Sequence, residues 1–207
     1  MKVLIINGSP HKKNTTWRAL DEIRKTLESE GIEAEIYNVP ADTAGCLGCN
    51  YCSKNGHCVR KDQVNDIAAR LDSIDGIIVG TPTYYASPSG SLIAFMDRLF
   101  YSAGSKLSKK PAAAVAIARR GGTETSFDVL NKYFTINEMP VISSTYWNNV
   151  FGFNPDDAEK DLEGLQTMRN LARNMAWILK AIDAGKKAGI MPPKTEESSF
   201  TSFGDGK

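Results

Sequence analysis

The stretch Lys2-Val-Leu-Ile-Ile-Asn-Gly-Ser-Pro-His-Lys-Lys-Asn-Thr-Thr16 decides the fold. Residues 3–6 are a short apolar run, typical of a strand buried on both faces. Asn7-Gly8-Ser9-Pro10 is a turn signature, and a helical pattern begins at about Thr15. A strand, a tight turn and a helix start form an anion site, because backbone N–H groups and the positive end of the helix point to one place.

Polar side chains in the same loop favour a phosphate monoester as that anion. The donors and cations are Ser9, His11, Lys12, Lys13, Asn14, Thr15 and Thr16. The loop is neither the G-x-G-x-x-G of dinucleotide sites, since it has Gly8 alone, nor a P-loop, since it lacks Gly-Lys-Ser/Thr. The alternative is an ordinary polar loop before a capped helix, because Ser, Asn and Thr also cap helices for stability alone.

Composition narrows the class of protein. The length of 207 residues indicates one domain, and the formal charge of +1, from 25 basic and 24 acidic residues, gives no electrostatic footprint for nucleic acid. The N-terminal apolar run is too short for a signal peptide, and no segment has the length of a membrane span. We therefore expect a soluble, cytoplasmic protein that binds neither nucleic acid nor membrane.

Strand and helix patterns alternate along the chain. Strands are predicted at residues 3–6, 32–39, 76–79, 112–118 and 140–144, and helices at 17–29, 64–71, 92–101, 125–133 and 156–184. This alternation predicts an α/β fold, a flavodoxin-like doubly wound parallel sheet of five strands in the order 2-1-3-4-5. Residues 41–61 form a cysteine-rich loop after the second strand. The domain is expected to span residues 1–185, and 186–207 to form a C-terminal arm or tail.

In this topology the loops after strands one, three and four meet at one edge of the sheet. The loop after strand three offers an exposed backbone turn and two aromatic rings, in Pro82, Thr83, Tyr84 and Tyr85. The loop after strand four offers close backbone approach and positive charge, in Arg119 or Arg120, Gly121 and Gly122. A ligand with one phosphate, a polyol chain and a flat ring fits these three loops, and FMN is such a ligand. Taken singly, each loop could also be a plain surface turn.

Four cysteines fall within thirteen residues, Cys46, Cys49, Cys52 and Cys58, in the spacing C-x2-C-x2-C-x5-C. Such a compact run differs from a disulfide framework spread over a secreted fold. Successive x2 spacings are typical of iron–sulfur ligation, so one [4Fe-4S] cluster with local ligands is the expected occupant. A zinc knuckle and four reduced free thiols are the alternatives. Of the two histidines, His11 lies in the phosphate loop and His57 is consistent with a solvated loop residue.

These motifs together resemble the flavodoxin-fold NAD(P)H-dependent FMN reductases, in their iron–sulfur flavoprotein branch. The resemblance rests on N-G-S-P, the cysteine run, G-T-P-T-Y-Y with S-G-S-L-x-A-F-x-D-R-L, and the G-G after strand four. It implies that the FMN phosphate is held by Ser9, His11, Asn14 and Thr16. It also implies a homodimer or tetramer in which the cluster of one subunit approaches the flavin of another.

The expected function is an FMN-dependent oxidoreductase whose cofactors carry the chemistry, so no catalytic acid or base is assigned. NAD(P)H is a possible donor, with Tyr84 or Tyr85 as a lid over the flavin. Three alternatives stay open: a cluster-free NAD(P)H:quinone or flavin reductase, a non-catalytic electron carrier between protein partners, and a zinc-stabilised binding module.

Overall fold

The computed structural model describes residues 1–197, 199, 201 and 204. In this part of the chain, parallel strands lie in the order β2-β1-β3-β5-β6, with the bounds Glu33–Asn38, Lys2–Asn7, Gly76–Tyr84, Ala112–Ala118 and Asn149–Phe151. The predicted doubly wound order 2-1-3-4-5 is thereby confirmed. A further short strand, β4 (Ser87–Pro88), pairs antiparallel with the end of β3.

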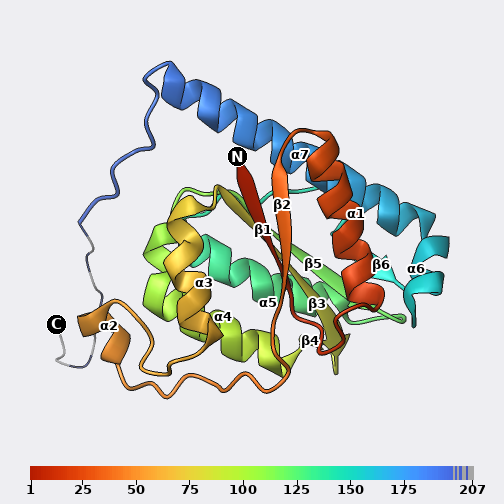
Figure 1. The fold of residues 1–207 in the computed structure, drawn as a ribbon, viewed down its shortest axis with the longest axis horizontal. Coiled ribbons are helices and arrows are strands. Elements are labelled where there is room, and N and C mark those ends of the chain that lie inside the picture. Colours follow the sequence, from red (N-terminus) through yellow and green to blue (C-terminus); the bar gives the residue numbers. More distant parts are fainter. Residues whose placement is uncertain (198, 200, 202–203, 205–207) are drawn as a thin grey trace.

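Helices cover both faces of the sheet (Figure 1). Helices α1 (Thr15–Ser29) and α7 (Leu162–Lys187) pack side by side on one face, while α3 (Gln63–Arg70), α4 (Gly90–Ala103) and α5 (Thr123–Ile136) cover the other. Strand β1 shows how the sequence divides these cores. Val3 and Ile5 belong to the α1–α7 core and Leu4 and Ile6 to the opposite one, because successive strand residues point to opposite faces.

The predicted fifth strand at residues 140–144 is wrong. Only an isolated bridge joins Val141 to Ala112, and the strand itself, β6, comes later. The polar run after Ile142 leaves the sheet for α7, where Ser144 Oγ donates to the Thr167 carbonyl at 2.6 Å. The chain returns at Asn148, whose Nδ2 donates to the Ala114 carbonyl at 2.9 Å. Side-chain bonds to α7 thus outcompete the ladder at this edge.

The predicted helix at 156–184 is divided in two. A short α6 (Pro155–Lys160) ends at Asp161, which has non-helical backbone angles, and α7 follows. Asp161 accepts hydrogen bonds from the Gly164 N–H at 2.9 Å and the Phe151 N–H at 2.7 Å. A carboxylate that caps one helix and holds the end of β6 explains the break.

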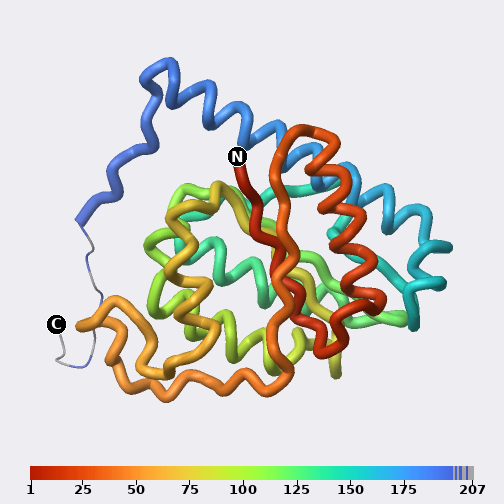
Figure 2. The backbone as a smooth tube through the Cα atoms, viewed as in Figure 1, coloured from red at the N-terminus to blue at the C-terminus, as the bar shows by residue number. Residues whose placement is uncertain are grey.

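The cysteine segment leaves β2 at the carboxyl edge of the sheet and runs along that edge to the short helix α2 (Tyr51–Asn55) at one end of the molecule (Figure 2). Two 3₁₀ turns, Leu71–Ser73 and Gly104–Leu107, complete the elements. Residues 188–197 form no helix or strand, and the rest of the predicted arm falls largely outside the described residues. None of the helices in the described part is long and apolar enough to cross a membrane.

Candidate functional site

The loop after β1 is held rigidly by its own polar groups. Asn7 Oδ1 accepts from the Ser9 N–H at 3.1 Å, and Ser9 Oγ accepts from the His11 N–H at 3.2 Å. Gly8 is required here, because a Cβ at that position would lie 2.5 Å from Leu92 Cδ2. The sequence therefore builds a tight, preformed turn directly before α1.

The first turn of α1 has no side-chain cap. Asn14 is the N-cap residue, but its side chain makes no capping hydrogen bond, and its Oδ1 instead accepts from Thr15 Oγ1 at 3.4 Å. The leading N–H groups of this helix are thus left without the partner that a stability cap would give. This geometry argues against the plain capped loop and for an anion-binding helix start.

A cavity of about 250 Å³ opens where the loops after β1, β3, β5 and β6 meet. It is lined by Ser9, His11, Asn14, Thr15, Thr16, Pro82, Thr83, Tyr84, Ile117, Ala118, Arg119, Gly152 and Phe153. The sequence-predicted loops therefore do converge. Tyr85, Gly121 and Gly122 do not line it, and Ile117, Ala118, Gly152 and Phe153 are additions that the sequence pattern missed.

One buried polar atom on the cavity wall has no partner. Thr83 Oγ1 is inaccessible to solvent and makes no hydrogen bond within the described chain. An unpaired buried hydroxyl is costly, so a ligand group that met this hydroxyl, once the Thr83 side chain rotated toward the cavity, would relieve the cost.

The loop after β3 is a tight hairpin with unusual backbone geometry. Tyr85 and Ala86, its two central residues, have positive φ values of 50° and 56°, which non-glycine residues rarely adopt. Two positive φ values are the requirement of a two-residue type I′ turn. The turn points Tyr84 at the cavity, whereas the Tyr85 side chain is fully exposed at the tip. Such local strain is typical of functional loops.

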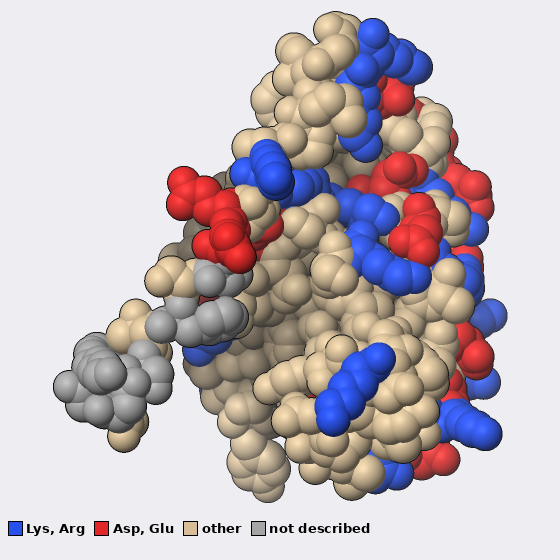
Figure 3. Space-filling model, turned by 90° about the vertical axis from the view of Figure 1, so that its left-hand side faces the viewer, with Lys and Arg blue, Asp and Glu red and all other residues tan. Residues whose placement is uncertain are grey.

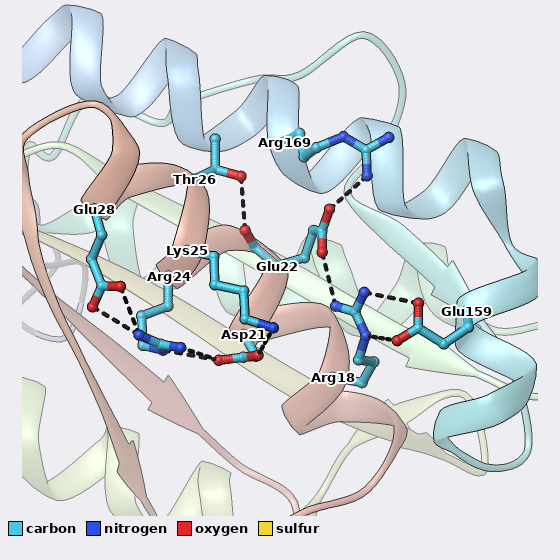
Figure 4. A network of polar contacts seen from close by, with 9 residues as sticks. All are labelled: Arg18, Asp21, Glu22, Arg24, Lys25, Thr26, Glu28, Glu159 and Arg169. Atoms are coloured by element: carbon cyan, nitrogen blue, oxygen red, sulfur yellow. Dashed lines mark hydrogen bonds and ion pairs between the residues drawn. The ribbon is translucent and has the colours of Figure 1, made fainter.

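Gly152 and Phe153 reach the cavity because α6 is fixed to α1. Arg18 forms ion pairs with Glu22 and with Glu159 of α6, and Arg169 of α7 pairs with Glu22 at 2.6 Å (Figure 4). Burial alone would raise the pKa of Glu22, but hydrogen bonds from Arg169 and Arg18 outweigh it and hold that pKa below its ordinary value. Helix α6 follows Phe153 directly, so this network holds the wall of the cavity.

All four cysteines line a second cavity, of about 180 Å³, at the end of the molecule where α2 lies. The remaining wall consists of Gly45, Leu47, Gly48, Asn50, Val59, Arg60, Arg98 and Tyr101. The thiols are free, with Cys46 and Cys49 exposed and Cys52 and Cys58 half-buried. His57 lies outside the wall, and its Nδ1 is 2.8 Å from the Asn55 carbonyl oxygen.

The cysteine cavity is open rather than closed on a single ion. Among the described residues, no group of three or more Cys, His, Asp or Glu side chains is arranged to hold a metal ion. Arg60 lines this cavity, and its Nε is buried without a hydrogen-bond partner in the described chain. The two cavities share no lining residue.

Comparison with known proteins agrees with this geometry. The family model for NADPH-dependent FMN reductase matches residues 1–153. An iron–sulfur flavoprotein of Methanocaldococcus jannaschii is 34% identical over 191 residues, covering 88% of this chain and 99% of that protein. The chain belongs to the NADPH-dependent FMN reductase family. Within that family it is an iron–sulfur flavoprotein relative.

Solved structures place this family member among flavodoxin-like folds. An archaeal flavodoxin matches with a TM-score of 0.61 at 16% identity, covering 87% of this chain and 99% of that one. The protein RosB, solved with an 8-demethyl-8-formylriboflavin-5′-phosphate intermediate, matches with a TM-score of 0.70 at 13% identity, covering 99% and 92%. At these identities the likeness concerns the fold alone.

Among the residues that line the cavity at the carboxyl edge, Phe153 is the one that the sequence pattern indicated least. The signal for it was the helix start Asn154-Pro155, since Asn at the N-cap and Pro at the first helical position mark a loop that precedes a helix. With the last strand predicted at 140–144 rather than at Asn149–Phe151, that loop could not be assigned to the carboxyl edge of the sheet.

Proposed function

We propose that this chain is an FMN-dependent oxidoreductase that holds its flavin in the cavity formed by the loops after β1, β3, β5 and β6. The observation that carries the proposal is the convergence of an uncapped helix start and an orphan Thr83 hydroxyl on one cavity at the carboxyl edge of the sheet. A phosphate suits the first, and a ring or polyol hydrogen-bonding group suits the second. The family assignment supports the same ligand.

Each part of the chain has a distinct task in this proposal. Backbone N–H groups at residues 14–16 and the hydroxyls of Ser9, Thr15 and Thr16 bind the phosphate, with His11 as a further donor. Thr83 and the backbone near Pro82 orient the ring, Tyr84 and Phe153 exclude water from its sides, and Arg119 adds positive charge. When bound, FMN supplies two-electron chemistry and the protein positions it.

We further propose that Cys46, Cys49, Cys52 and Cys58 hold one [4Fe-4S] cluster. The support is that all four thiols are free and line one cavity, whose wall also includes Arg60, a positive charge suited to an anionic occupant. Four irons spread their thiolate ligands more widely than a single ion does, so the open arrangement suits a cluster better than zinc.

We also propose that NAD(P)H is the electron donor and that the chain assembles into a homodimer or tetramer. On the side of the molecule seen in Figure 3, most charged side chains lie in the upper part, and the lower part is mostly uncharged apart from one Lys or Arg near its middle and charged groups along its edge. Apolar side chains at the rim of the cysteine cavity are exposed, among them Leu47 at 62% and Tyr101 at 74%. Such a surface fits docking by apolar contact, with a second subunit or a protein electron partner.

The experiment is purification under strict anoxia, followed by an absorbance spectrum and quantification of flavin and iron. We expect about one FMN and about four iron atoms per chain. Protein that stays colourless after incubation with FMN would overturn the flavin assignment. Reduction by NADPH, by NADH and by a reduced ferredoxin, followed in a stopped-flow instrument, separates an NAD(P)H-dependent enzyme from a carrier between protein partners.

A second candidate is a cluster-free flavin or quinone reductase. It is favoured by the exposure of Cys46 and Cys49 at the protein surface. A Cys49→Ala variant decides between the two. Loss of iron with retained FMN indicates a cluster, whereas a wild type that binds FMN but no iron, with unchanged NADPH oxidation in the variant, indicates the cluster-free enzyme.

A further inference from the structure

Arg98 is the largest fully buried side chain among the described residues and lines the cysteine cavity from α4. Its Nε donates to Cys58 Sγ at 3.3 Å. Its Nη1 donates to the Ala44 carbonyl at 3.1 Å and to Asp62 Oδ2 at 2.8 Å, and its Nη2 donates to Asp62 Oδ1 at 2.6 Å. One guanidinium therefore connects the beginning of the cysteine loop, its last thiol and the N-cap residue of α3.

A buried guanidinium is expensive unless its charge and donors are satisfied. Asp62 provides a two-pronged ion pair on the Nη side, which leaves Nε free to face sulfur. For fold stability alone, an apolar residue with the same volume would serve as well or better. A purely structural role does not explain why the Arg98 Nε points toward a thiol.

The contact singles out Cys58 among the four thiols. Cys46 Sγ accepts from the Gly48 N–H at 3.5 Å, and within the described chain only Cys58 accepts from a charged donor. The Cys58 backbone is held as well, since its N–H donates to Asn65 Oδ1 at 2.9 Å and its carbonyl accepts from Asn65 Nδ2 at 2.9 Å. Cys58 is thus held through both its sulfur and its backbone, whereas Cys46 and Cys49 lie in a segment without helix or strand and Cys52 lies in the short helix α2.

We propose that Arg98 is a positioning residue of the cysteine site, which fixes Cys58 Sγ as the anchoring ligand and sets the reduction potential of the cluster through a charge-assisted N–H···S bond. The inference rests on the cluster proposed above. Hydrogen bonds to ligating sulfur and nearby charge are known determinants of cluster potential. A one-electron reduction adds negative charge to the site, so a cationic donor beside Cys58 stabilises the reduced form and raises the potential.

The test compares Arg98→Met, Arg98→Lys and the control Arg70→Met in the full-length protein, after anoxic reconstitution with iron and sulfide. Arg70 is a matched arginine because it pairs with Glu35 and does not line the cysteine cavity. Iron per chain is measured, and each potential is determined by titration with dithionite against mediator dyes. We expect Arg98→Met and Arg98→Lys to shift the potential to more negative values, and Arg70→Met to leave it unchanged.

Arg98→Lys keeps the positive charge beside Asp62, so it provides a second variant if Arg98→Met does not fold. Circular dichroism checks that both variants are folded. Iron-loaded, folded Arg98 variants with the wild-type potential would overturn the proposal. If the wild type binds no iron, the cluster assignment itself fails. Hydrogen exchange of residues 44–58 in the iron-free protein then decides the positioning role: about tenfold faster exchange in the Arg98 variants supports it, and unchanged exchange overturns it.

Discussion

Gly122, the residue before α5, lies against Ala86 at the tip of the β3–β4 hairpin. A Cβ on Gly122 would be 3.0 Å from both Cα and Cβ of Ala86, and Gly122 has a φ of 87°. Gly122 therefore does not line the cavity at the carboxyl edge of the sheet, whereas the sequence pattern predicted that it would contact the ligand there. It locks together the two loops that carry Thr83 and Arg119.

We predict that Gly122→Ala weakens FMN binding by about tenfold, since left-handed strain of about 1–3 kcal/mol and the clash with Ala86 push the two loops apart. Fluorescence quenching of FMN measures the affinity. Gly121→Ala is the matched control, because no atom lies within 4 Å of a Cβ at Gly121 and its φ is not positive. Equal affinities of the two variants would contradict the prediction.

Thr83→Val tests whether the orphan hydroxyl serves the ligand. We expect FMN affinity to fall by about fivefold to tenfold, the effect of about 1 kcal/mol for one hydrogen bond. The melting temperature of the flavin-free protein should stay equal or rise, because a buried unpaired hydroxyl is removed.

Thr81→Val supplies the contrast on the same strand. Thr81 Oγ1 accepts from the buried Ser89 N–H at 3.0 Å, so its loss leaves that donor unpaired and should lower the melting temperature of the flavin-free protein. If Thr83→Val destabilises the flavin-free protein as much as Thr81→Val does, the hydroxyl has a structural partner and the ligand role is wrong.

Phe153→Ala tests the wall contributed by the β6–α6 loop. We expect a threefold to tenfold weaker FMN affinity, since about 1 kcal/mol of apolar contact is lost at the cavity. Phe151→Ala removes the same side chain two residues earlier, outside this cavity, and should leave the affinity near that of wild type. The same calorimetric titration serves both variants, and a larger effect at Phe151 would refute the placement.

The sequence predicted the sheet order because buried strands such as β5, seven residues without an exposed position, leave an unmistakable apolar run. It misplaced the last strand because β6 has three residues, of which Val150 is the only buried apolar one. Val141 and Ile142 gave a stronger local signal, and only tertiary bonds from α7 to Ser143 and Ser144 remove that segment from the sheet.

The residues of the candidate site also differ in whether local sequence signals could predict them. Ser9 and Thr16 were predictable since turn and helix-start signals place them by short-range rules. Arg98 was not, because within an apolar helix a lone arginine carries no sign of the thiol and carboxylate that it meets 40 and 36 residues away. Contacts between distant segments depend on the packed fold and not on local pattern.

Glu22→Gln tests the network that holds α6 to α1 and α7. At pH 7 we expect a melting temperature lower by about 2–4 °C, the shift that a loss of about 1 kcal/mol gives in a domain of this size. The folded-state pKa of Glu22 lies below the ordinary 4.5, so the stability that its charge contributes is present above pH 4.5 and is lost as the pH falls through the lowered value. The difference in melting temperature between wild type and variant should therefore shrink on acidification below pH 4.5.

Thermal scans from pH 7 to about pH 3.5 check this, with Glu163→Gln as the control because Glu163 has no ion pair among the described residues. A difference that persists unchanged at the acid end would show that Glu22 acts through packing and not through its charge.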